Sequence, residues 1–185
     1  MNRREDERYV SECLTTTPSA FETPLQELTY RALAELEIPC VRVETDEAIT
    51  MEDCRHINER LALAMVKTIF LATRNGQRIF LFVPTGGKPF HTTLFSDALA
   101  VPRVSFAPAT MRETMLGTKV GAATVFSALL DGVNKVSVVI DRDVANQEWY
   151  GCSDGTTTGY MKVKTEQIIG VFLPHANHTP AIIEI

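Results

Sequence analysis

The sequence predicts one α/β domain in which helices flank a mixed β-sheet. Its 185 residues are a usual length for a single domain, and 45% of them are hydrophobic, enough for a sizeable core. Apolar segments at helical and at strand spacing follow one another along the chain. They do so without a strict strand–helix–strand rhythm, which favours a mixed sheet over a doubly wound parallel one.

The first helix is expected directly after Thr23. This residue can cap the helix, Pro24 suits the first helical position, and Gln26 stands three residues after the cap. Pro39 ends the helix about four turns later. The preceding segment, residues 1–22, is polar and mixed in charge, and we expect a loosely ordered extension or a short leading helix. The domain proper is therefore predicted over residues 23–185.

The remaining elements alternate along the chain. Asn75-Gly76 between the apolar runs 66–73 and 78–83 is a strong hairpin signal. The other expected strands are 40–43, 103–106, 136–140, 160–163 and 181–185. The other expected helices are 51–63, capped by Thr50, and 93–99, 109–116 and 165–173.

Charge and composition exclude several function classes. The chain has 18 Lys and Arg against 23 Asp and Glu, a net charge of −5, so it is a poor binder of DNA or RNA duplexes by bulk charge. No apolar run approaches the roughly 20 residues of a membrane helix, and no hydrophobic stretch follows the N-terminus as in a signal peptide. The four cysteines are scattered, which argues against a zinc ribbon and a disulfide scaffold. We expect a cytoplasmic protein without membrane or DNA partners.

Familiar catalytic and metal-binding motifs are missing. The chain has neither a phosphate-binding loop nor a Gly-x-Ser-x-Gly elbow, and the Gly-rich stretch 117–121 lacks the spacing of a nucleotide fingerprint. His175 and His178 stand between prolines with no carboxylate, so a solvated loop is favoured over a metal site. Cys152 is expected in a loop, as a small buried side chain rather than a nucleophile. No metal and no cofactor are expected.

Several segments in fixed order carry a resemblance to a known family. They are Val66-Lys67-Thr68 with the apolar residues after it, and the segments 88–90, 103–107, 116–121, 126–131, 138–141 and 164–166. Together these segments resemble the YbaK/ProX family of aminoacyl-tRNA deacylases, stand-alone relatives of the editing domain inserted in bacterial prolyl-tRNA synthetases. The resemblance covers residues 24–185. It implies a strongly twisted mixed sheet surrounded by helices.

The resemblance also implies a reaction and a partner. A mischarged aminoacyl-tRNA would be hydrolysed at its terminal adenosine, and the acceptor end of that tRNA would be the partner. Because the ester is already activated, positioning, a water and oxyanion donors suffice. In the family a strand lysine holds the phosphate and ribose of the terminal nucleotide, which is Lys67 here. Backbone amides of a Gly-rich loop face the carbonyl, which corresponds to Gly121 followed by Ala122 and Ala123.

Each of these residues has a plainer interpretation as well. Lys67 can be a surface lysine, although a charge among apolar neighbours costs free energy unless it is paired or faces a cleft. Gly121 lets a backbone N–H approach an ester, or simply forms a turn. Asp131 matches a turn aspartate of the family, and a structural role is favoured for it.

The chain departs from the family at the pocket. Thr68 stands where the family has asparagine, and Ser153-Asp154-Gly155 replaces a His-Pro-Asn stretch that borders the amino-acid pocket. Asp154 is expected either to attract the substrate's α-ammonium group or, as favoured, to cap its loop. These changes leave a second hypothesis open, a non-catalytic relative that binds an aminoacyl or nucleotide ligand. The amino acid removed stays undetermined.

Docking of tRNA on an acidic protein requires a local basic rim. The candidates are Arg74, Arg78, Lys88, Arg103 and Lys119. With few phosphate contacts, binding should weaken only modestly with salt. A homodimer is compatible with the sequence.

Overall fold

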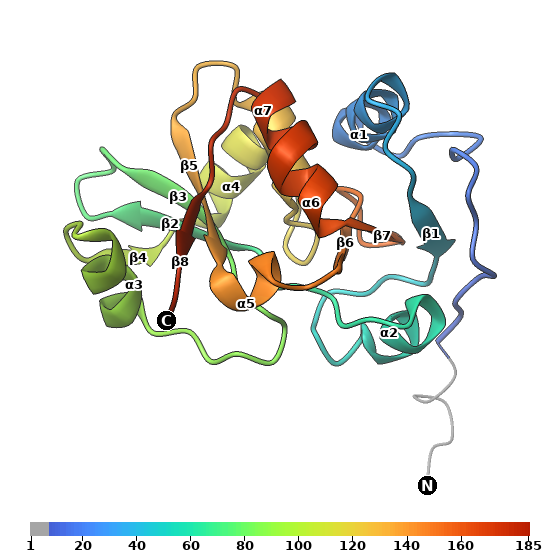
Figure 1. Ribbon diagram of the computed structural model, residues 1–185, viewed down its shortest axis with the longest axis horizontal. Coiled ribbons are helices and arrows are strands. Elements are labelled where there is room, and N and C mark those ends of the chain that lie inside the picture. The colour runs from blue at the N-terminus through green and yellow to red at the C-terminus, as the bar shows by residue number, and fades with distance from the viewer. Residues whose placement is uncertain (1–7) are drawn as a thin grey trace, which may run out of the picture.

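The computed structural model describes residues 8–185 and contains two β-sheets with helices packed around them (Figure 1). The larger sheet has the strand order β4-β2-β3-β5-β8. Its strands are β2 (Ile69–Thr73), β3 (Ile79–Val83), β4 (Val104–Phe106), β5 (Val136–Asp141) and β8 (Ala181–Ile183). β2 pairs antiparallel with β3 and β4, whereas β5 pairs parallel with β3 and β8. This mixed pairing confirms the predicted fold class.

A smaller, antiparallel sheet has the order β1-β7-β6. It comprises β1 (Val41–Glu44), β7 (Gly159–Lys164) and β6 (Trp149–Ser153). The division of the strands over two sheets and the strand β6 are additions to the predicted elements. Cys152 therefore lies in a strand opposite Met161, and its expected place in a loop was wrong. Gly151, in the middle of β6, weakens the strand pattern there.

The predicted helices occur in the expected order, with the start of one corrected, and α5 and η1 are additions to them. They are α1 (Pro24–Glu35), α2 (Arg55–Leu61), α3 (Thr92–Leu99), α4 (Ala109–Leu116), α5 (Arg142–Ala145), the 3₁₀ turn η1 (Val125–Leu130), and a last helix made of α6 (Thr165–Gln167), the π-helical η2 (Ile168–Phe172) and α7 (Leu173–His175). Thr23 caps α1 as expected, because its Oγ1 accepts from the Gln26 N–H at 3.1 Å. The helix expected from residue 51 begins only at Arg55. Thr50 instead accepts from the Asp53 N–H and closes a separate turn before it.

Both faces of the larger sheet are covered. Leu71, Phe80 and Phe82 pack toward α3, and Phe70 and Leu81 pack toward α4. Since successive strand residues point to opposite faces, strands covered on both sides read as continuous apolar runs. The hairpin is confirmed, with β2 and β3 joined at the predicted turn.

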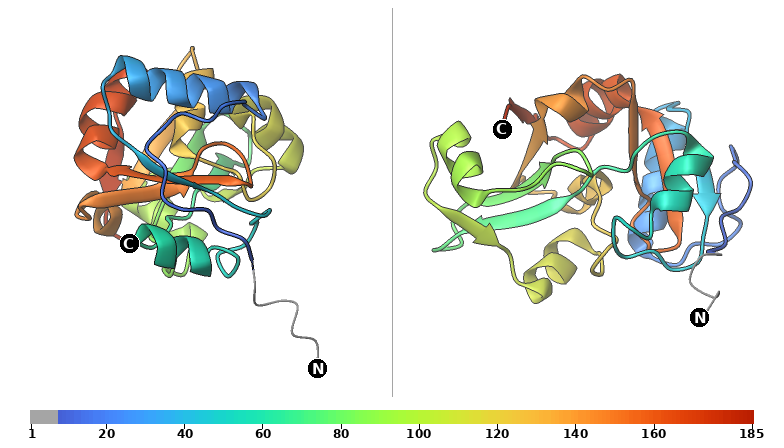
Figure 2. Two further views of the ribbon diagram at one scale, coloured as in Figure 1. Left: turned by 90° about the vertical axis from the view of Figure 1, so that its right-hand side faces the viewer. Right: turned by 90° about the horizontal axis from the view of Figure 1, so that it is seen from below.

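The largest core cluster holds the two sheets together. It includes Tyr150 of β6, Ile140 of β5 and Phe172 of the last helix, all fully buried. The rings of Phe126 and Phe172 meet edge to face with centroids 5.0 Å apart. Figure 2 shows α1 and the last helix packed over the smaller sheet. Within the described residues no helix combines the length and apolar character needed to cross a membrane.

The described part of the N-terminal extension runs along β1. Val10 bridges to Thr45, and Leu14 bridges to Arg42. The Ser11 N–H donates to the Glu44 carbonyl at 2.9 Å. Residues 8–22 are thus hydrogen-bonded to the smaller sheet, which corrects the expectation of a loose tail or leading helix. Residues 1–7 of the predicted extension lie outside the described residues.

Candidate functional site

A cavity of about 360 Å³ lies where the two sheets meet. The segment just before β2 joins them. The Val66 N–H donates to the Gly151 carbonyl of β6 at 2.9 Å, and the Lys67 N–H donates to the Pro84 carbonyl at 3.1 Å. Because this segment is bonded on both sides, its side chains are held between the sheets.

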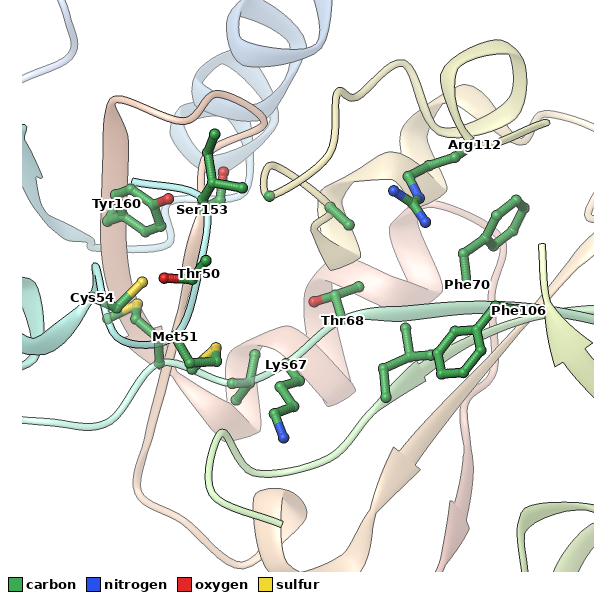
Figure 3. Close-up of a pocket in the computed structure, with 16 residues that line it drawn as sticks. Thr50, Met51, Cys54, Lys67, Thr68, Phe70, Phe106, Arg112, Ser153 and Tyr160 are labelled. Carbon is green, nitrogen blue, oxygen red and sulfur yellow. The ribbon is translucent and has the colours of Figure 1, made fainter. Parts of the chain in front are cut away.

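The cavity has two ends of different character (Figure 3). One end is formed by the segment 49–54 with Ser153 and Tyr160 of the smaller sheet. The other end is formed by Phe70, Phe106 and Arg112 of the larger sheet and α4. Between them stand Lys67 and Thr68, together with Gly121 and Ala123 of the loop that follows α4.

Lys67 is half-buried and has donor capacity to spare. Its Nζ donates to the Lys88 carbonyl at 3.1 Å, and an ammonium group carries two further N–H donors. It lies two residues before the start of β2 instead of within the strand as expected. The structure does bring it into one cavity with Gly121 and Ala123, the backbone with which the sequence grouped it.

The loop after α4 requires a glycine at position 121 for two reasons. Gly121 has φ +87°, a left-handed conformation that side chains disfavour, and an added Cβ would lie 2.8 Å from the Ile49 Cα. The Ala122 N–H is engaged by the Lys119 carbonyl at 3.1 Å. Across residues 8–185, the Gly121 and Ala123 N–H groups have no hydrogen-bond partner. Two residues that line the cavity, Gly121 and Ala123, therefore each keep an unpaired backbone N–H.

The segment 49–54 is fixed by Asp53. Its Oδ2 accepts from the Thr50 N–H at 2.9 Å and the Ile49 N–H at 3.0 Å, and these hydrogen bonds lower the pKa of Asp53. Arg8 pairs with the other carboxylate oxygen at 2.6 Å. Cys54 lines the cavity, but burial raises its pKa to about 11. Its thiol is therefore protonated at neutral pH and is not a ready nucleophile.

The side chains that line the cavity are positive or neutral, whereas the protein as a whole carries a net negative charge. No acidic side chain lines it among the described residues, whereas two cations, Lys67 and Arg112, do. In the part of the chain that the structure covers, the Arg112 guanidinium has no ion-pair or hydrogen-bond partner. Two cations and no acid among the described lining residues, in a protein of net charge −5, indicate a site for an anionic ligand.

The replaced stretch 153–155 divides between the cavity and the protein interior. Ser153 lines the cavity, but its Oγ donates to the Thr156 carbonyl at 2.6 Å and accepts from the Gly155 N–H at 3.0 Å. The buried Asp154 carboxylate accepts from Gln26, Tyr30 and Thr156. It therefore caps its own loop and anchors α1, as the favoured interpretation held.

Two predicted substrate contacts lie on the far side of the loop after α4. Ala122 and Gly155 line a separate hollow there, together with Thr118 and Lys119. Neither residue is among those that line the cavity of Lys67. The structure thus separates Ala122 from its neighbours Gly121 and Ala123.

Asp131 is engaged in the interior. Its carboxylate accepts from the Val136 N–H at 2.7 Å and the Lys135 N–H at 2.9 Å, and lies 3.0 Å from His178 Nε2. Burial by itself raises the pKa of Asp131, but these hydrogen bonds outweigh it and lower the pKa. The carboxylate does not line the cavity, so its place among the substrate contacts gives way to the structural role that was favoured.

The histidines differ from the expectation at one position. His178 is buried, with 2% of its surface exposed, and its Nδ1 lies 2.6 Å from the Ala176 carbonyl, so a solvated loop was wrong for it. His175 is exposed. Over residues 8–185 no group of three or more His, Cys, Asp or Glu side chains is placed to hold a metal ion.

The basic rim predicted from the sequence is not the source of the cavity's charge. None of its five candidate residues lines the cavity. The expectation that Lys88 offers a free charge to tRNA was wrong, because its Nζ is paired with Asp141 at 2.8 Å and Asp143 at 2.6 Å.

The sequence reasoning missed Arg112, although a signal for it existed. It stands four residues before Leu116, the one buried residue of α4, and residues at this spacing share a helix face. Phe106 and the segment 49–54 carried no comparable signal. They reach the cavity only through the arrangement of the two sheets.

Comparison with known proteins places this cavity in a family context. A zebrafish (Danio rerio) protein, prolyl-tRNA synthetase associated domain-containing protein 1, is 24% identical over 153 residues, 82% of each chain. The crystal structure of hypothetical protein APE2540 superposes with a TM-score of 0.65 and 14% identity, covering 83% of this chain and 97% of that one. The crystal structure of a candidate trans-editing enzyme for prolyl tRNA synthetase superposes with a TM-score of 0.61 and 12% identity. The match covers 89% of this chain and 99% of that one.

At these identities the two solved structures show a shared fold. The family model of the aminoacyl-tRNA editing domain matches residues 45–170, which include the cavity residues from Ile49 to Tyr160. Since this match spans well over half of the sequence, the chain belongs to the aminoacyl-tRNA editing domain family.

Proposed function

We propose that this protein is a trans-editing hydrolase that removes the amino acid from a mischarged aminoacyl-tRNA. The observation that carries the proposal is a cavity that two cations and no acid line among the described residues, together with two residues, Gly121 and Ala123, whose backbone N–H groups are unpaired. Such a cavity suits an RNA 3′ end, whose phosphates are negative and whose ester carbonyl gains negative charge during hydrolysis. Membership of the editing domain family supports the same substrate class.

The proposed reaction uses positioning and backbone donors. A water attacks the ester carbonyl carbon, and the carbonyl oxygen becomes an oxyanion that the N–H groups of Gly121 and Ala123 stabilise. The bond to the ribose oxygen then breaks, which leaves the free amino acid and the tRNA hydroxyl. Preorganised donors of this kind are worth several kcal/mol in other enzymes, so a protein nucleophile is not required. A protonated Cys54 agrees with this scheme.

Lys67 anchors the terminal nucleotide in this proposal. Its ammonium has two N–H donors beyond the one given to Lys88. Lys67 lies between the two ends of the cavity, with its side chain directed toward the segment of Lys88. A contact from a charged donor to phosphate or ribose contributes about 1.5–3 kcal/mol. Thr68, on the same segment, offers a hydroxyl where the family resemblance implied an amide.

A panel of mischarged tRNAs tests the proposal. We expect the wild-type protein to cleave at least one member well above the spontaneous rate. Lys67→Ala should lower that rate about tenfold to a hundredfold, because it removes the anchor. Lys135→Ala is the matched control, since Lys135 is exposed and lies outside the cavity. Its rate should equal that of the wild type.

Two outcomes would contradict the proposal. Failure to cleave any tRNA in the panel, while aminoacyl-adenosine analogues still bind, would identify a binding module instead of a hydrolase. Equal rates for Lys67→Ala and the wild type would remove Lys67 from the mechanism.

A further inference from the structure

Arg112 is placed to bind an anion in the cavity. It extends from α4 with its guanidinium directed toward the middle of the cavity, on the opposite side of Thr68 from Lys67 (Figure 3). The side chain is half-buried and, among the described residues, unpaired. Arg31 on α1, by contrast, pairs with Glu27 at 2.8 Å. A guanidinium that is partly withdrawn from water without a partner is suited to a phosphate, which it can bind with two parallel N–H donors.

Phe106 gives the same end of the cavity an exposed aromatic face. It is 63% exposed, a large value for a phenylalanine, although it lies on a strand of the larger sheet. Its ring meets Phe90 edge to face with centroids 5.7 Å apart, so the ring is held from one side. Proteins bind single-stranded nucleic acid by combining exposed rings, which stack on bases, with cations that contact phosphates, and this end of the cavity is lined by one of each.

We propose that the α4 end of the cavity is the nucleotide end, where Arg112 binds a phosphate of the tRNA acceptor strand and Phe106 stacks on a base. The inference rests on the proposed function and fixes the direction of the substrate. The amino acid then points to the end formed by Ser153, Tyr160 and the segment 49–54. The described residues that line the cavity at that end are uncharged, whereas the α4 end carries Arg112.

The test separates phosphate binding from base binding. The probes are a stable 3′-amide analogue of aminoacyl-adenosine, carrying the amino acid that the panel shows to be cleaved fastest, and its 5′-monophosphate. Calorimetry gives the affinity of each probe, and their ratio measures what the phosphate contributes. For the wild type we expect the phosphate to tighten binding at least about tenfold.

Arg112→Gln should lose a large part of this phosphate gain, with the remainder due to Lys67, while its affinity for the uncharged probe stays unchanged. Arg112→Lys, which keeps the charge but not the planar fork, should retain part of the gain. Arg31→Gln removes the same charge from an exposed site on α1 and should keep the full gain. An undiminished gain in Arg112→Gln would overturn the assignment of Arg112 and leave the proposed function standing.

Phe106→Leu should weaken both probes by the same factor, about fivefold or more, since stacking does not depend on the phosphate. Tyr9→Leu, at another exposed aromatic residue, is the control and should bind both probes as the wild type does. Unchanged affinities in Phe106→Leu would overturn the stacking. If neither probe binds the wild-type protein, the proposed function itself fails.

Discussion

The Asp131 carboxylate organises the connection between η1 and β5. Both of its oxygens accept hydrogen bonds, from the N–H groups of Lys135 and Val136 and from His178 near the C-terminus. We predict that Asp131→Asn lowers the free energy of unfolding by about 1–3 kcal/mol, because an amide offers one acceptor oxygen where the carboxylate offers two. Urea unfolding measures this. Asp97→Asn, at an exposed position on α3, is the control and should change little.

The same carboxylate gives the stability a defined pH dependence. Its folded-state pKa lies below the ordinary value of 3.8, so its contribution is present above that value and is lost as the pH falls through the folded-state pKa. The stability difference between wild type and Asp131→Asn should therefore be constant from neutral pH to about pH 5 and shrink below about pH 4. A difference that grows in acid would contradict the lowered pKa.

At the scale of elements, the loop between α4 and η1 holds Gly121 in a left-handed conformation and carries the proposed oxyanion donors. We predict that Gly121→Ala slows deacylation and lowers the free energy of unfolding by about 1 kcal/mol or more, because the new Cβ meets the Ile49 backbone at a positive φ. Rate assays and urea unfolding of the same variant measure both effects. Gly87→Ala is the control, since an added Cβ there meets nothing within 4 Å and its φ is ordinary. Full activity in Gly121→Ala would separate this backbone from catalysis.

Capping and turn residues in the sequence correctly predicted the elements that they begin or join. Thr23 with Pro24 marked the start of α1, and Asn75-Gly76 marked the hairpin, because capping and turn chemistry depend on neighbouring residues alone. β6 was missed because Gly151 interrupts its pattern, and its stability comes from pairing with β7. The start of α2 was misplaced because Thr50 caps a turn with the same chemistry that caps a helix.

The site was predictable in part, for a related reason. The family resemblance led to Lys67 and Gly121, which the structure brings together in one cavity. Asp154 and Asp131 stand in loops that look equally suited to ligand binding or to capping, and only their buried partners distinguish these roles. Segments far apart in sequence meet at the junction of the two sheets, and no periodicity of hydrophobic residues reports how two sheets pack.

On the scale of the whole molecule, the cavity concentrates positive charge in an acidic protein. A net charge of −5 disfavours RNA binding by bulk charge, so the proposed binding depends on Lys67 and Arg112, which line the cavity. Acidic residues elsewhere disfavour any extended footprint along the tRNA. The expected complex is therefore limited to the acceptor end, with specificity set by the cavity.

The salt dependence of tRNA binding tests this picture. For a single strand, each neutralised phosphate contributes about −0.7 to the slope of log affinity against log salt, so two contacts predict a slope of about −1.4. Arg112→Gln should reduce the magnitude of this slope by about 0.7. Arg31→Gln, with the same loss of charge on α1, should leave the slope unchanged. Equilibrium binding of a stable aminoacyl-tRNA analogue across a salt series measures the slope. A slope of about −4 or steeper would require some six phosphate contacts, and the protein would then have to hold the tRNA along a surface well beyond this cavity.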